Sequence, residues 1–131
     1  MTDTGPSPFQ ILNPSVPAVA RADDDTAASP VERVQRMVKG SEMFVFMKGS
    51  PDAPRCGFSA NTVALLDAYG FQYDSFDVLS DEAIREAAKE VASWPTFPQV
   101  WLHGELLGGH DIVLEMHQSG ELESLAREVR R

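Results

Sequence analysis

Residues 46–59 read FMKGSPDAPRCGFS, and this stretch joins an apolar, strand-like run to the start of a predicted helix. The turn at 48–51 ends the strand, and Cys56 follows where the helix begins. A helix N-terminus and a nearby cation both favour a charged sulfur, and Lys48 and Arg55 supply cations. We therefore predict that Cys56 is a functional thiol with a lowered pKa. The alternative, an inert core cysteine, fits poorly with neighbouring prolines, glycine and cations.

Cys56 is the only cysteine in the sequence. In a C-x-x-C redox motif the second cysteine would stand where this chain has Ser59. The thiol therefore cannot form a disulfide within its own chain, and its chemistry needs a thiol from another molecule. A single cysteine also excludes a disulfide framework and fits a reducing compartment, so we expect a cytoplasmic protein.

The length of 131 residues suits one domain. Residues 1–30 are rich in proline, include three consecutive aspartates at 23–25 and have few periodic aliphatic residues. We predict that they form a disordered, acidic N-terminal tail, and that the folded domain covers residues 31–131. No stretch is long and apolar enough to span a membrane, and the first residues lack the pattern of a secretory signal.

The formal net charge is −9, which argues against binding to a nucleic-acid backbone. Against this acidic background, the cations around Cys56 indicate a small anionic ligand that is held locally.

Hydrophobic periodicity predicts an α/β fold with a mixed four-stranded sheet and helices on both faces. The β-α-β unit should be parallel and the terminal hairpin antiparallel. The expected helices cover residues 31–39, 57–69, 80–91, 112–118 and 122–130, and the expected strands cover 43–47, 72–78, 99–103 and 105–107. The strand at 43–47 is apolar without alternation, which is typical of a strand buried on both faces.

Four motifs occur in a fixed order: FMKG at 46–49, CGFS at 56–59, WPTFPQ at 94–99 and GGHDI at 108–112. Together they closely resemble the monothiol glutaredoxins of the CGFS type, from about residue 31 to residue 129. The resemblance implies a thioredoxin-like fold, and it implies that Cys56 is a ligand of a 2Fe–2S cluster. It also implies that glutathione is bound by Lys48, Arg85, the backbone of Phe97 before a cis-proline, His110 and Asp111.

These implied roles are physically reasonable, although simpler ones exist. Lys48 and Arg85 could neutralise the carboxylates of glutathione, and Asp111 could meet its ammonium group. Without the motif, Arg85 would be read as a surface partner of Asp81, one helical turn earlier. Asp111 could also serve as a helix N-cap.

His110 stands where the family commonly has cysteine, which removes the only plausible second thiol of the protein. Our hypothesis is that His110 keeps a hydrogen-bond donor near glutathione and makes its affinity, or the stability of the cluster, dependent on pH. A neutral structural role is the alternative.

A 2Fe–2S cluster takes about four thiolate ligands, and one chain supplies one. Two chains with two glutathiones would supply four, which predicts a homodimer bridged by the cluster. The resemblance implies a carrier that delivers clusters to recipient apoproteins, often with a BolA-like partner.

One alternative is a glutathione-dependent thiol–disulfide oxidoreductase with Cys56 as the catalytic nucleophile. The resemblance implies that this activity is weak, because the loop at 50–54 lengthens the approach to the thiol. A third possibility is an iron-sensing adaptor that acts with a BolA-like protein.

Overall fold

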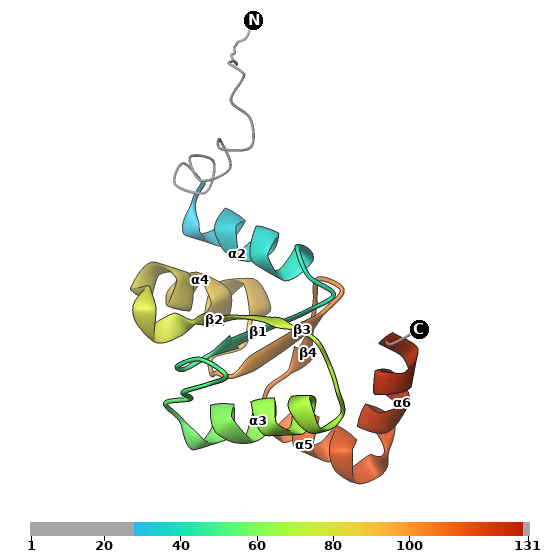
Figure 1. Cartoon of the computed structure of the whole chain (residues 1–131). Helices are drawn as coiled ribbons and strands as arrows, with labels where there is room; N and C mark the ends of the chain where they lie inside the picture. The colour runs from blue at the N-terminus through green and yellow to red at the C-terminus, as the bar shows by residue number, and fades with distance from the viewer. Residues whose placement is uncertain (1–27, 130–131) are drawn as a thin grey trace, which may run out of the picture.

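The computed structural model describes residues 28–129, so nearly all of the predicted tail lies outside the described residues. A four-stranded sheet lies between two groups of helices (Figure 1). One face is covered by α2 (Pro30–Lys39) and α4 (Glu82–Ala92). The other face is covered by α3 (Gly57–Ala68), α5 (His110–Ser119) and α6 (Glu121–Val129).

The sheet has the strand order β2-β1-β3-β4, and it is mixed as predicted. Strand β1 (Met43–Met47) pairs in parallel with β2 (Asp74–Asp77) and antiparallel with β3 (Gln99–Leu102). Strand β3 pairs antiparallel with β4 (Glu105–Gly108). Both turn residues of this hairpin, His103 and Gly104, have positive φ angles of 53° and 80°, as a two-residue type I′ turn requires.

All five residues of β1 are buried, which confirms the prediction of a strand covered on both faces. Phe44 and Phe46 belong to the apolar core beneath α2 and α4. Met43, Val45 and Met47 point the other way, into the core beneath α3, α5 and α6. The alternation of side chains along a strand thus places β1 at the centre of the fold.

Two local predictions around β2 need correction. The strand expected at 72–78 is shorter, because the Asp77 carboxylate accepts the backbone N–H of Leu79 and turns the chain into the short 3₁₀ helix η1 (Val78–Ser80). The next helix is also expected to begin at residue 80. The N-cap of α4 is instead Asp81, whose Oδ1 accepts the N–H of Ile84 at 3.2 Å.

Candidate functional site

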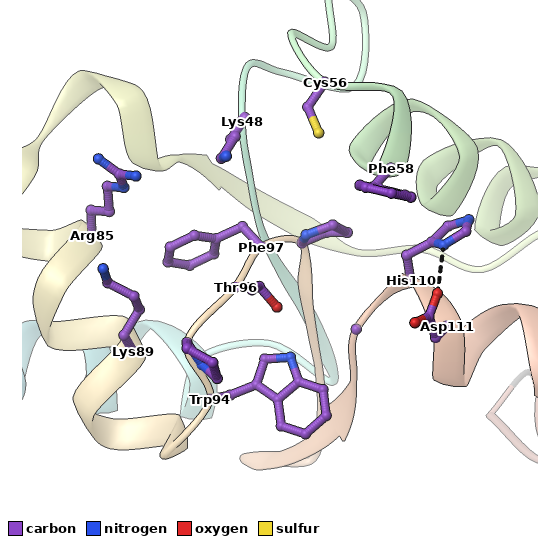
Figure 2. A pocket seen from close by; sticks show the side chains of 13 residues that line it. Lys48, Cys56, Phe58, Arg85, Lys89, Trp94, Thr96, Phe97, His110 and Asp111 are labelled. Carbon is purple, nitrogen blue, oxygen red and sulfur yellow. Dashed lines mark hydrogen bonds and ion pairs between the residues drawn. The ribbon is translucent and has the colours of Figure 1, made fainter.

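A pocket of about 390 Å³ lies where the starts of α3 and α5 meet α4 and the chain before β3 (Figure 2). This volume lies within the range of about 300–1,000 Å³ that is usual for small-molecule sites. The structure brings all the residues predicted from the sequence into the lining of this single pocket: Lys48, Cys56, Arg85, Phe97, His110 and Asp111.

The Cys56 thiol is partly exposed at the N-cap of α3. The pKa of this thiol is lowered, chiefly because the backbone N–H of Ser59 hydrogen-bonds the sulfur. Burial opposes this effect, whereas the Phe58 amide, the positive charge of Lys48 and the Ser59 hydroxyl add to it. Arg55, which the sequence suggested as a second cation, is exposed and does not line the pocket.

Ser59 has a role that its position in the CGFS motif does not reveal. Its side chain is fully buried, and its Oγ accepts the backbone N–H of Lys48 at 3.2 Å. The hydroxyl also contributes to lowering the pKa of the Cys56 thiol. Ser59 therefore connects the end of β1 to the first turn of α3 and brings Lys48 and Cys56 together.

Arg85 reaches the pocket from the first turn of α4. Its Nε is buried and has no hydrogen-bond partner within residues 28–129, so the guanidinium keeps a donor available for a ligand. The alternative partner, Asp81, is engaged elsewhere: its carboxylate lies 3.6 Å from Arg33. Lys89, one turn further along α4, also lines the pocket and pairs with Glu86 at 3.0 Å.

The chain before β3 presents backbone groups to the pocket. The Phe97–Pro98 peptide bond is cis, as the resemblance implied. In the part of the chain that the structure describes, neither the N–H nor the C=O of Phe97 makes a hydrogen bond. An extended peptide ligand could therefore pair with this backbone.

Gln99 holds this segment in place from inside the core. Its side chain is fully buried, its Nε2 donates to the Trp94 carbonyl at 3.2 Å, and its Oε1 accepts from the Trp101 indole at 3.2 Å. Trp94 forms part of the pocket wall close to Gly109, where an added Cβ would lie 3.2 Å from the indole Nε1. Trp94 and Gly109 were not predicted as lining residues, although they belong to the WPTFPQ and GGHDI motifs.

The start of α5 closes the pocket on the side of Phe58. Its N-cap is Gly109, and no side chain caps the first amides. The His110 ring packs against Phe58 in a tilted arrangement with a centroid distance of 5.1 Å, and its Nδ1 lies 3.3 Å from Asp111 Oδ1. The Asp111 side chain is 97% exposed, so it remains available to a ligand. Whether His110 confers pH dependence stays a prediction.

The electrostatics of the pocket favour an anion. The N-termini of α3 and α5 both open onto it, and a helix N-terminus carries partial positive charge. Lys48 and Arg85 add full positive charges in a protein whose net charge is −9. The site can therefore hold a thiolate next to a small, carboxylate-bearing peptide.

Known proteins with similar sequences are glutaredoxins. Residues 43–107 match the family model described as Glutaredoxin. The chain is 46% identical over 101 residues to Glutaredoxin 4 of Escherichia coli (strain K12), which covers 77% of this chain and 88% of that protein. It is 44% identical over 118 residues to Monothiol glutaredoxin-S11 of Oryza sativa subsp. japonica, covering 86% of this chain. The chain spans only 24% of the length of that relative.

Among solved structures, the chain resembles a buckwheat glutaredoxin–glutathione complex with a TM-score of 0.66 and 26% identity, covering 76% of this chain and 88% of that one. The chain belongs to the glutaredoxin family, and its fold is thioredoxin-like as predicted. Within that family it is a monothiol glutaredoxin, because its single cysteine occupies the site and similar relatives carry that name.

Proposed function

We propose that this protein binds 2Fe–2S clusters with the help of glutathione and transfers them to recipient apoproteins. The observation that carries the proposal is the position of Cys56, an activated and partly exposed thiol at the mouth of a cationic pocket. A thiolate is the form of cysteine that binds metal.

Several features of the pocket support glutathione as the second ligand. Lys48 and Arg85 offer two cations for its two carboxylates, and the free backbone of Phe97 offers a peptide-pairing edge. The uncapped start of α5 could hold a carboxylate, and the exposed Asp111 could meet the ammonium group. The likeness to a buckwheat glutaredoxin solved in complex with glutathione agrees with this choice.

The number of ligands supports a cluster shared between two chains. The sequence has one cysteine, and within the described residues no group of three or more His, Cys, Asp or Glu side chains could hold a metal ion. A cluster that takes about four thiolates therefore needs two chains and two glutathiones. Two of the four thiolates would belong to glutathione molecules that the protein holds without a covalent bond. The cluster should therefore be transferable to other proteins. A BolA-like partner and a cytoplasmic location belong to the same proposal.

A second candidate function is thiol–disulfide exchange with glutathionylated proteins. The lowered pKa and partial exposure of Cys56 favour it, since the thiolate is the attacking species.

None of the helices among residues 28–129 is long and apolar enough to cross a membrane.

Anaerobic reconstitution with iron, sulfide and glutathione tests the proposal. We expect a coloured dimer with about one 2Fe–2S cluster per two chains, which loses its colour when glutathione is removed. Cys56→Ser should bind no iron or sulfide while keeping its fold. A colourless wild-type monomer that reduces glutathionylated substrates would move the assignment to oxidoreductase.

Two further variants test the glutathione clamp. Arg85→Ala should weaken glutathione binding by about tenfold, because it removes a hydrogen bond to a charged group. This value is at the lower end of the range for such bonds, since Arg85 is only partly buried and solvent screens its charge. The matched control is Arg127→Ala on α6, an exposed arginine paired with Glu123. The control should leave glutathione affinity unchanged, and equal effects of both variants would contradict the clamp.

A further inference from the structure

The carboxylate of Asp77 lies at the end of β2, beside the turn that precedes the thiol. Its Oδ1 accepts two backbone hydrogen bonds, from Gly49 N–H at 2.9 Å and from Leu79 N–H at 2.9 Å. Gly49 directly follows Lys48, and Leu79 lies in η1, which leads into α4. One half-buried oxygen atom therefore connects the turn that carries Lys48 to the segment that leads to Arg85.

The loop of residues 49–55 is otherwise held by hydrogen bonds within itself and to Lys48, the residue that precedes it. Ser50 and Ala53 exchange backbone hydrogen bonds of 3.3 and 3.0 Å, and Arg55 N–H donates to the Lys48 carbonyl at 2.8 Å. Among the residues that the structure describes, the bond from Gly49 to Asp77 is the hydrogen bond that joins residues 49–55 to a different element. The loop would thus lose its attachment to β2 without Asp77.

We propose that Asp77 is a positioning residue of the thiol site, which fixes the turn at Lys48–Gly49 so that the Lys48 charge stays in front of Cys56. Lys48 lies between Arg85 and Cys56 in the pocket (Figure 2). The proposal deepens the proposed function, on which it rests only for the identity of the anionic ligand. Asp77 itself does not line the pocket, so it acts through the turn that it holds.

The structure separates this role from a simple charge effect, because the two effects have opposite signs. A carboxylate near the pocket repels anions, so removing its charge alone would make the pocket more attractive to an anion. Releasing the turn would instead move the Lys48 charge away from Cys56 and make the pocket less attractive. The direction of the change therefore identifies the role of Asp77.

The test uses the single thiol as its own reporter. Cys56 in the reduced, full-length protein is alkylated with anionic iodoacetate and with neutral iodoacetamide, and the ratio of the two rates is measured. Both reagents react with the same thiolate, so the thiolate fraction cancels and the ratio reports the local positive potential. Asp77→Ala should lower the ratio by roughly two- to fivefold, the size of one partly screened unit-charge interaction.

Asp77→Asn removes the charge but keeps an oxygen acceptor for Gly49, so it isolates the charge effect, and its ratio should stay level or rise. The control is Asp74→Asn, which removes an exposed charge from the same strand where the carboxylate contacts Ser41. A rise, or no change, in the ratio of Asp77→Ala would overturn the proposal, and so would a fall in Asp77→Asn as large as that in Asp77→Ala. If Asp77→Ala does not fold, Asp77→Ser, which also removes the carboxylate and shortens the side chain, is judged by the same criterion.

A parallel glutathione titration of the same proteins keeps two possible failures apart. Wild-type protein that binds no glutathione would contradict the proposed function, while the alkylation ratio would still decide the role of Asp77. If wild type binds glutathione and Asp77→Ala binds it equally well, with an unchanged ratio, the positioning role is wrong and the proposed function stands.

Discussion

Substitution of Gly49 tests whether the loop of residues 49–55, which precedes Cys56, is tightly closed. Its φ angle is +93°, and a Cβ added there would lie 2.5 Å from the Ala53 carbonyl oxygen and 2.7 Å from the Arg55 nitrogen. Both atoms are backbone atoms of the loop that ends at Cys56. Gly49→Ala therefore combines an unfavourable backbone conformation with a clash that a side-chain rotation cannot relieve.

Two other glycines separate these two costs. Gly120 has a φ angle of +88° but nothing within 4 Å of an added Cβ, so Gly120→Ala measures the conformational cost, about 1–2 kcal/mol. Gly57 has open space and lies in the first turn of α3, so Gly57→Ala should be neutral or stabilising by up to about 1 kcal/mol. Gly49→Ala adds overpacking of about 1–3 kcal/mol to the conformational cost, or about 2–5 kcal/mol in all.

Urea denaturation followed by circular dichroism measures the three free energies of unfolding, with equal m-values as the check that the unfolded states are comparable. From the most to the least stable variant, the expected order is Gly57→Ala, Gly120→Ala and Gly49→Ala. If Gly49→Ala were no less stable than Gly120→Ala, the loop would be free to move away from the added methyl group. The reasoning that a tightly closed loop positions Cys56 would then be refuted.

Two further predictions concern the thiol. Ser59→Ala leaves the Lys48 N–H without its acceptor and should cost about 1–3 kcal/mol of stability. The pKa of Cys56 should rise yet stay below that of an ordinary thiol, because the Ser59 amide remains; thiolate absorbance against pH measures this, and a fully ordinary pKa would contradict it. The second prediction compares wild type with Cys56→Ser in denaturation at several pH values. Because folding lowers the thiol pKa, the unfolded state binds more protons between the folded pKa and the unfolded value of about 8.5. The stability of wild type relative to Cys56→Ser should therefore rise with pH across that window and be lost as the pH falls through the folded pKa. A flat difference would mean that the folded protein does not favour the thiolate.

Much of this protein could be predicted from local patterns. The apolar run of β1, the helical periodicities and the turn at 103–104 are local signals. They were enough to predict the mixed sheet with helices on both faces. The lowered pKa of Cys56 was also predictable, because the amides responsible for it lie within three residues of the thiol. The site residues were found through four short motifs whose order identifies a known family.

The contacts that hold those residues in place come from packing between distant parts of the chain. Asp77 contacts a turn that lies 28 positions earlier in the chain, and Ser59 bonds Lys48 across 11 positions. Local spacing cannot reveal such pairs, because they exist only after β1, β2 and α3 pack together. For the same reason the sequence suggested Arg55 as a cation for the thiol, although the folded loop leaves it exposed outside the pocket lining. Residue types and local order therefore indicate which groups carry the chemistry, and packing between distant segments places some of them in front of the thiol.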